Sequence, residues 1–329
     1  MELYGDLAGQ YRDFAEYAAG DSPCFEAWAF GVAGDPEVLA WIGVLPPVKQ
    51  QPNLVFAAAR WHGVPAPGPY DGLRTALLAD DGAIRSTILT RSTQTNEVGR
   101  LATLVPVFSM IEHQAGRPLA LIEVGASAGL CLYPDRYGYA WTSGSGAVLT
   151  STPASPTLAC EVTGPASLPH RPPQVAWRGG LDLNPLDVSD DDAMAWLANL
   201  VWPEQDDRRR RLEAAVAVAR AEPPVLRQGD LLTDLPALLE EAAGHGEVVV
   251  FHSAVIAYLE PADRERFHLR MTDLVADGVC RWVSNEAPAV LPAVVDTAGS
   301  PAPAGRFVLG LDGRAVAWTH GHGRSMTWL

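Results

Sequence analysis

Hydrophobic positions in the first 118 residues recur with the period of a helix. Leu7 and Tyr11 are four residues apart and belong to a run of apolar residues at helical spacing. Ser22 and Asp35 each stand directly before a proline, and a capping side chain followed by a first-turn proline is typical of a helix start. The region shows no convincing strand alternation, so we expect residues 1–118 to form a helical cap.

From residue 119 onward, short apolar runs alternate with helical patterns. The runs predict buried strands at 119–122, 174–181, 224–226, 247–251 and 279–283. Such an alternation predicts a doubly wound, mostly parallel sheet over residues 119–329. A stretch rich in Gly, Ser, Thr and Pro interrupts it, and there we expect a loop and hairpin insertion at about 140–176.

The last predicted element is an antiparallel hairpin. Two apolar runs, 306–311 and 314–319, flank the dipeptide Asp312-Gly313, which favours a tight turn. The fold class that we expect is therefore α/β, with a mostly parallel sheet, an antiparallel C-terminal hairpin and an N-terminal helical cap.

Composition and charge narrow the function classes. The chain has 329 residues and a net charge of −15 at pH 7, which repels a polyphosphate backbone and argues against a nucleic-acid partner. No apolar run is long enough to span a membrane, and the N-terminus lacks the pattern of a signal peptide. The four cysteines are widely spaced, which argues against a zinc site and fits a reducing compartment. We expect a cytoplasmic protein that acts on a small molecule without a metal; the sequence leaves the oligomeric state open.

The segment from Glu123 to Gly129 fits two chemistries. It ends an apolar strand with a carboxylate and continues as a loop of small residues. As acid-x-Gly-x-x-x-Gly it predicts a nucleotide-cofactor loop, because glycines let the backbone approach a ligand and a helix that starts there offers unpaired N–H groups. As Gly-x-Ser-x-Gly it predicts the nucleophile elbow of a serine hydrolase, with Ser127 as the nucleophile.

The hydrolase alternative needs further partners. An acid and then a histidine must follow the serine, and Asp230 or Asp263 followed by His320 or His322 meets that order. However, a hydrolase elbow normally follows several strands and an upstream oxyanion loop, and the first 118 residues show neither. The cofactor interpretation is therefore the first choice.

Polar residues at the strand ends favour a nucleoside cofactor. In an open α/β sheet, ligands bind outside the carboxyl ends of the strands. The sequence places Glu123, Asp182, Asp230 and His252 at such ends. Carboxylates accept hydrogen bonds from ribose hydroxyls or from the exocyclic amine of adenine, so these positions suit a nucleoside.

Three stretches resemble class I S-adenosylmethionine-dependent methyltransferases. They are Glu123–Gly129, Gly229-Asp230 after the third strand, and Val248–Leu259, and the terminal hairpin is similar to the antiparallel seventh strand of that family. The resemblance covers roughly residues 119–329. It implies a Rossmann-like sheet, S-adenosylmethionine as the cofactor and methyl transfer to an unidentified small-molecule acceptor.

The resemblance also implies which residues form the site. The residues that would hold the cofactor are Glu123, Gly125, Ser127, Gly129, Asp182 and Asp230. His252 and Glu286 would face the acceptor as catalytic residues, and Gln94, Asn96 and Glu97 would close over it and bind substrate. A non-catalytic module that binds a nucleoside cofactor is a further alternative.

The whole chain also resembles an uncharacterised bacterial family, domain of unknown function 2332. The matching stretches are Gln94–Glu97, Glu123–Gly129, Asp182–Pro185, Phe251–Ser253 and Ser284–Pro288. This second resemblance supports one fold across the chain and implies no activity.

Overall fold

The computed structural model describes residues 6–94, 96–144, 146–149 and 155–329, and their contacts define two compact units. The first unit contains the described residues up to 94 together with Asp191–Arg210, and the second contains Asn96–Asp190 and Arg211–Leu329. Contacts thus divide the chain before residue 96, whereas the sequence pattern predicts a boundary at residue 118.

The first unit is helical, as the spacing of its apolar residues predicts. Its elements are α1 Leu7–Ala18, α2 Pro23–Ala33, α3 Pro36–Gly43, the 3-10 turn η1 Pro47–Lys49, α4 Pro52–Trp61, α5 Tyr70–Leu78, α6 Ala83–Thr90 and α8 Asp191–Asn199. Both predicted caps are present. Ser22 Oγ accepts the N–H of Phe25, and the Asp35 carboxylate accepts the N–H groups of Glu37 and Val38.

The core of the helical unit includes a segment from late in the chain. The Trp202 ring lies 5.7 Å from that of Phe14 and 5.9 Å from that of Phe25, measured between centroids. Arg60 Nη1 donates to the carbonyl oxygens of Asn199 and Val201, each at 2.8 Å. Residues 191–210 therefore complete this core, which a contiguous helical cap does not include.

The second unit is built on a single mixed sheet. Within the described part of the chain it has eleven strands in the order β3-β2-β4-β11-β10-β9-β8-β7-β1-β5-β6. The strands are β1 Leu119–Val124, β2 Gly138–Ser143, β3 Gly146–Leu149, β4 Thr157–Thr163, β5 Val175–Asp182, β6 Val225–Gln228, β7 Glu247–Ser253, β8 Arg281–Glu286, β9 Arg306–Leu311, β10 Arg314–His320 and β11 Ser325–Trp328. Neighbours from β6 to β8 run parallel, whereas β8, β9, β10 and β11 pair antiparallel. The predicted mostly parallel sheet with an antiparallel C-terminal hairpin is confirmed.

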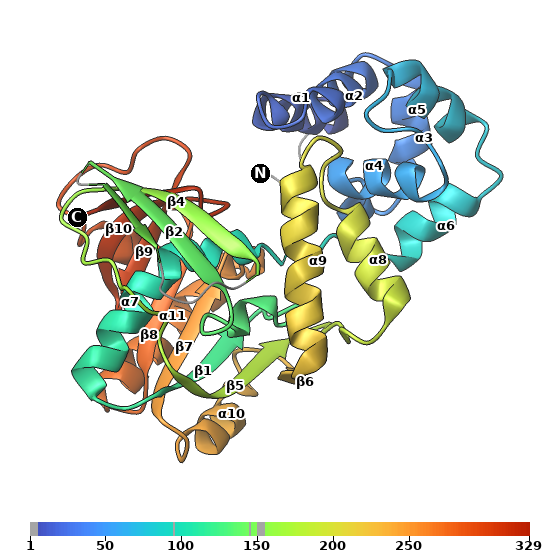
Figure 1. The fold of residues 1–329 in the computed structure, drawn as a ribbon. Helices are drawn as coiled ribbons and strands as arrows, with labels where there is room; N and C mark the ends of the chain where they lie inside the picture. Colours follow the sequence, from blue (N-terminus) through green and yellow to red (C-terminus); the bar gives the residue numbers. More distant parts are fainter. Residues whose placement is uncertain (1–5, 95, 145, 150–154) are drawn as a thin grey trace. The chain divides into compact units, whose positions relative to one another are not determined.

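Helices cover both faces of this sheet (Figure 1). The helical elements of the second unit are η2 Val98–Arg100, α7 Leu101–Ala115, η3 Leu130–Leu132, residues 211–221 of α9 Asp206–Ala221, α10 Leu235–Ala242, η4 Ile256–Tyr258, α11 Pro261–Ala276 and α12 Pro292–Val295. Phe108 of α7 packs on Phe251 with ring centroids 5.2 Å apart. Ile122 and Val250 belong to the core that α10 and α11 complete. Successive strand side chains point to opposite faces, so α7 covers one face and α10 and α11 cover the other.

The sheet curls around α7, which contacts β2 and β4 as well as β7 and β8. This helix contains Pro106, which has no N–H to donate to the carbonyl of Ala102 one turn earlier. Trp141 of β2 replaces that donor, with its Nε1 at 2.8 Å from the Ala102 oxygen.

The C-terminal hairpin has the predicted turn. Asp312 and Gly313 have φ angles of 51° and 79°, the left-handed values that a type I′ turn requires at both positions. The next strand, β11, was not predicted, and it pairs parallel with β4. The predicted insertion therefore extends the main sheet through β2, β3 and β4. Residues 150–154 of the predicted insertion lie outside the described residues.

None of the helices in the described ranges is long and apolar enough to cross a membrane.

Candidate functional site

The strand order changes direction beside β1. The chain adds β5 and β6 on one side of β1, and β7 and β8 on the other. Ligand sites of open α/β sheets lie outside the carboxyl ends of the strands at such a point. Glu123 lies in β1, Asp182 ends the adjacent β5, and Asp230 follows the end of β6. The parallel register places all three acids along one edge of the sheet.

Glu123 is a buried acid with an unsatisfied oxygen. The residue is 7% exposed, and its Oε2 has no hydrogen-bond partner among the described residues. Burial raises the pKa of Glu123 well above its usual range, the nearby Asp182 carboxylate raises it further, and the Arg100 guanidinium opposes both effects. The carboxyl group therefore keeps its proton at a pH where an exposed glutamate has lost it.

Arg100 is the cation next to this carboxyl group, and it was not singled out from the sequence. Its Nη1 donates to the carbonyl oxygen of Ser253 at the end of β7, and its Nε donates to that of Gly321, each at 2.8 Å. The residue is only 9% exposed. The sequence feature that could have identified Arg100 is its position between the apolar residues Val98 and Leu101. A charged residue among buried positions needs fixed partners.

Asn96 fastens the loop that follows β1. Its Nδ2 donates to the carbonyl oxygen of Ala126 at 2.8 Å, and its Oδ1 accepts the N–H of Leu130 at 3.0 Å. Glu97 is 5% exposed, and its Oε1 accepts the N–H of Gly99 at the start of η2. The structure thus brings Asn96, a predicted substrate residue, to the glycine loop, and it places the carbonyl oxygen of Glu97 3.7 Å from the thiol of Cys131 in the turn that follows. Gln94 belongs to the helical unit.

The glycines of the loop allow the protein to pack closely against itself. Gly125 and Gly129 both have a φ of 69°, in the left-handed region. A Cβ atom at Gly125 would lie 2.4 Å from a methyl group of Val255, and one at Gly129 would lie 2.9 Å from Pro224 Cγ. Close packing already explains both glycines, so their presence alone does not indicate a ligand.

Asp182 and Asp230 each bind local backbone. Asp182 Oδ2 accepts the N–H of Ser127, and its Oδ1 accepts that of Asn184, both at 2.8 Å. Asp230 is exposed, and its Oδ1 accepts the N–H of Leu232 at 2.7 Å. A carboxylate oxygen can accept more than one hydrogen bond, so both residues keep acceptor capacity for a ligand while they shape the edge of the sheet.

Ser127 lacks the surroundings of a nucleophile. Its φ of 51° is left-handed and it is 5% exposed, but its Oγ is buried and has no hydrogen-bond partner in the described ranges. A catalytic serine is activated by a base within hydrogen-bond reach. The geometry therefore does not favour the serine hydrolase alternative.

A fluorophosphonate probe is expected to leave Ser127 unlabelled, because none of the described residues places a base within hydrogen-bond reach of its hydroxyl group. Intact-protein mass spectrometry on the wild type and on Ser127→Ala measures the labelling. Stoichiometric labelling of the wild type that disappears in Ser127→Ala would restore the hydrolase interpretation.

His252 and Glu286 form a buried pair on the other face of the sheet. Both residues are 0% exposed. Trp282 Nε1 donates to His252 Nε2 at 3.1 Å, so His252 Nδ1 carries the hydrogen and donates to Glu286 Oε1 at 2.8 Å. Phe251, the neighbour of His252, is the register partner of Glu123. Because side chains alternate along a strand, His252 points to the face opposite Glu123.

This geometry favours a structural role for the pair. Glu286 Oε1 also accepts the N–H groups of Val255 and Ile256 at 2.9 and 3.2 Å, which fixes the chain just after β7. Both ring nitrogens of His252 are occupied, so neither is free to take a proton from a substrate. The catalytic assignment of His252 and Glu286 stays a prediction from the sequence.

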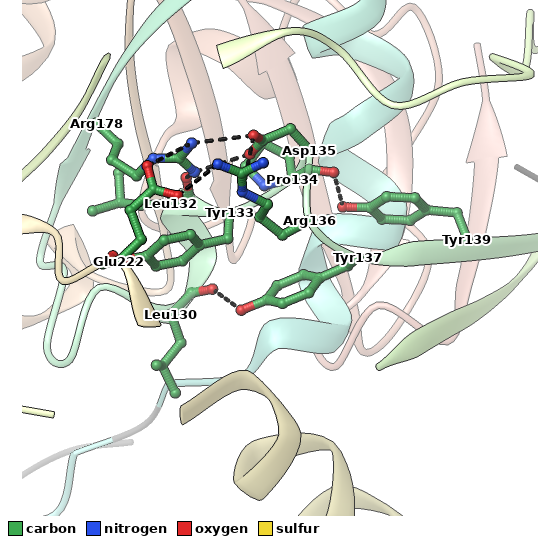
Figure 2. A network of polar contacts seen from close by, with 10 residues as sticks. All are labelled: Leu130, Leu132, Tyr133, Pro134, Asp135, Arg136, Tyr137, Tyr139, Arg178 and Glu222. Atoms are coloured by element: carbon green, nitrogen blue, oxygen red, sulfur yellow. Dashed lines mark hydrogen bonds and ion pairs between the residues drawn. The ribbon is translucent and has the colours of Figure 1, made fainter. Parts of the chain in front are cut away.

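The helix expected after the glycine loop is absent, and this expectation was wrong. Leu130–Leu132 form one 3-10 turn, and the chain then leads into β2. Figure 2 shows how tyrosine hydroxyl groups fix this segment. Tyr137 donates to the carbonyl oxygen of Leu130 at 2.8 Å, and Tyr139 donates to that of Pro134 at 2.9 Å. Hydrogen bonds from side chains thus satisfy backbone carbonyl groups that an α-helix would pair with its own N–H groups.

A buried arginine completes this network (Figure 2). Arg178 of β5 is 8% exposed and donates from two nitrogens to the two oxygens of Asp135, at 2.9 and 3.1 Å. Its Nη1 also donates to the carbonyl oxygen of Leu132, and its guanidinium lies 4.8 Å from the centre of the Tyr133 ring. Sequence reasoning missed this network, because its partners are 43 residues apart.

A cavity of about 290 Å³ opens on the same face of the sheet as Glu123. It is lined by Pro185, Leu186, Asp187, Val188, Pro223, Pro224 and Leu226. Leu226 pairs with Gly180, which pairs with Glu123, so register places these positions on one face. Hydrogen bonds from the N–H and hydroxyl groups of Ser189 lower the pKa of Asp187, which is the one acidic residue among those that line this cavity.

Comparison with known proteins assigns the chain to a family. Residues 8–328 match the family described as "Uncharacterized protein conserved in bacteria (DUF2332)", and the chain belongs to it. No curated protein and no solved structure was found to match the chain. The family suspected from the sequence is therefore confirmed.

Proposed function

We propose that this protein binds a nucleoside cofactor at the carboxyl edge of β1, β5 and β6, and that it transfers a methyl group from S-adenosylmethionine to a small molecule. The observation that carries the proposal is the strand order β6-β5-β1-β7-β8. In chain order these strands are third, second, first, fourth and fifth, as in doubly wound nucleotide-binding sheets. That order aligns Glu123, Asp182 and Asp230.

The groups at this edge fit a nucleoside without phosphates. Asp182 and Asp230 keep acceptor capacity for ribose hydroxyls or an exocyclic amine. A phosphate-bearing cofactor would favour a helix N-terminus after the loop. Here only a 3-10 turn follows, and Asn96 takes the N–H of Leu130. S-adenosylmethionine carries no phosphate, so it does not need those N–H groups.

Methyl transfer from S-adenosylmethionine requires little acid–base catalysis by the protein. When bound, S-adenosylmethionine supplies a methyl group on a good leaving group. The protein then mainly positions the acceptor in line and excludes water. A base is needed only where the acceptor must lose a proton. Asn96 and Asp182 hold the loop in a fixed shape for this purpose.

The binding step is tested with two conservative variants. Asp182→Asn and Asp230→Asn are each expected to weaken binding of S-adenosylhomocysteine by roughly 1–3 kcal/mol, because each removes a charged acceptor. Isothermal titration measures the affinities, and Asp273→Asn on the exposed side of α11 is the matched control. If the wild type shows neither heat nor a melting shift with millimolar S-adenosylmethionine or S-adenosylhomocysteine, the proposal fails.

A non-catalytic nucleoside-binding module is the second candidate. The observation that favours it is the full hydrogen bonding of His252 on the face opposite Glu123. Such a module would bind S-adenosylmethionine and S-adenosylhomocysteine equally well and would release no S-adenosylhomocysteine from bound S-adenosylmethionine over time.

A further inference from the structure

The charges around Glu123 would not balance if Glu123 itself were ionised. Asp182 faces it from β5 and Arg100 from η2. The charges of Glu123, Arg100 and Glu97 also act on the pKa of the Cys131 thiol in η3. Arg100 gives hydrogen bonds to two backbone carbonyls, and none of its hydrogen bonds goes to Glu123. Ionised Glu123 would therefore be a second negative group beside Asp182, with Arg100 as the nearby cation.

The proton on Glu123 is thus held by its surroundings. A buried carboxylate without hydrogen bonds pays a large desolvation cost, and a second carboxylate nearby adds repulsion. Glu123 Oε2 is buried and has no partner in the described part of the chain. A positive group close to this oxygen would favour the ionised form of Glu123, because it would offset the negative charge of the carboxylate.

We propose that a cationic group of the ligand displaces the proton of Glu123 when it binds at the end of β1. The O–H bond of the carboxyl group breaks, the proton passes to solvent, and the carboxylate pairs with the cation. This inference rests on the proposed function and adds the charge class of the bound group. In S-adenosylmethionine that group is either the sulfonium or the ammonium, whereas S-adenosylhomocysteine has only the ammonium.

Isothermal titration in two buffers measures this proton. At one pH, phosphate and Tris differ in ionisation enthalpy, so a difference in the observed heat counts the protons released. We expect about one proton for each S-adenosylmethionine bound, and an affinity that rises up to about tenfold per pH unit below the pKa of Glu123. Methylthioadenosine, which has neither cationic group, is expected to bind without proton release.

Variants assign the proton to its residue. Glu123→Gln is expected to bind without buffer-dependent heat, and Glu265→Gln, an exposed position on α11, is expected to behave as the wild type. Release with S-adenosylmethionine alone identifies the sulfonium, and release with S-adenosylhomocysteine as well identifies the ammonium. Binding without release, equal release with methylthioadenosine, or release that persists in Glu123→Gln overturns the inference.

A ligand-free measurement separates this inference from the proposed function. Folding raises the pKa of Glu123 from an ordinary value of 4.5, so the folded state binds the proton more tightly than the unfolded state. The melting temperature of the wild type is therefore expected to fall relative to that of Glu123→Gln as the pH rises above 4.5, until the raised pKa is passed.

The two failures are then distinct. Parallel melting curves for the wild type and Glu123→Gln would show that Glu123 is already ionised, which overturns the inference whatever the ligand does. Absence of binding by all three nucleosides overturns the proposed function, and the proton-linked site falls with it, even where the melting curves show a protonated Glu123.

Discussion

Replacing Asp135 by alanine is expected to lower the free energy of unfolding by about 3–5 kcal/mol, because it takes both hydrogen-bonding carboxylate oxygens from the buried Arg178 and leaves only the longer ion pair, at 3.7 Å, with the half-exposed Glu222. Arg178 is 8% exposed and gives Asp135 two of its hydrogen bonds. Urea denaturation followed by circular dichroism measures the loss. The loop that follows β1 is expected to become less ordered at the same time, since Arg178 also holds the carbonyl of Leu132.

The same network offers a matched control. The Arg136 side chain is 48% exposed and pairs with Glu222, which is 51% exposed, and more distantly with Asp135 at 3.6 Å, so Arg136→Ala is expected to cost no more than about 1 kcal/mol. The double variant Asp135→Ala, Arg178→Met removes the buried charge together with its partner and is expected to recover part of the stability. An Asp135→Ala protein as stable as the wild type would contradict the importance given to this ion pair.

Replacing Glu286 by alanine is expected to lower the free energy of unfolding by roughly 3 kcal/mol or more, because three buried or partly buried donors lose their acceptor. These donors are His252 Nδ1 and the N–H groups of Val255 and Ile256. Glu286→Gln keeps an acceptor oxygen and is expected to be much closer to the wild type. Thermal and denaturant unfolding of both variants provide the measurement.

This pair of variants distinguishes a structural from a catalytic Glu286. A structural role requires that stability falls in Glu286→Ala, while ligand binding by Glu286→Gln stays near that of the wild type. If Glu286→Ala folds with wild-type stability but loses methyl transfer, the catalytic prediction from the sequence is correct and the structural interpretation is wrong.

Local patterns predicted the elements whose cause is local. Ser22 and Asp35 cap their helices as expected, because a side-chain acceptor and a following proline act within one turn. Asp312-Gly313 makes its turn for a similar reason. The alternation of apolar runs also predicted that Glu123, Asp182 and Asp230 would share one edge of a parallel sheet.

Long-range pairing set what the sequence could not predict. His252 lies next to the last residue of β7, near the strand end as expected, but the face it points to depends on register, and a shift of one residue reverses it. The turn at Leu130 replaced an expected helix because partners such as Asn96 and Tyr137 satisfy its backbone. Neither partner is identifiable from the loop itself, since Asn96 is 34 residues away in the chain and Tyr137 follows the turn by 7 residues, just before β2.

In the sequence, the strands between β1 and β5 look like an insertion that the fold does not need. The helix α7, which packs against them, nevertheless depends on the side chain of Trp141. Proline at position 106 leaves the carbonyl of Ala102 without a helical donor, and the indole of Trp141 supplies one from β2. Deletion of this insertion would therefore leave the buried carbonyl group of Ala102 in α7 without a hydrogen-bond donor. Pro106 and Trp141 therefore depend on each other, and a protein without β2 is expected to have a residue other than proline at position 106.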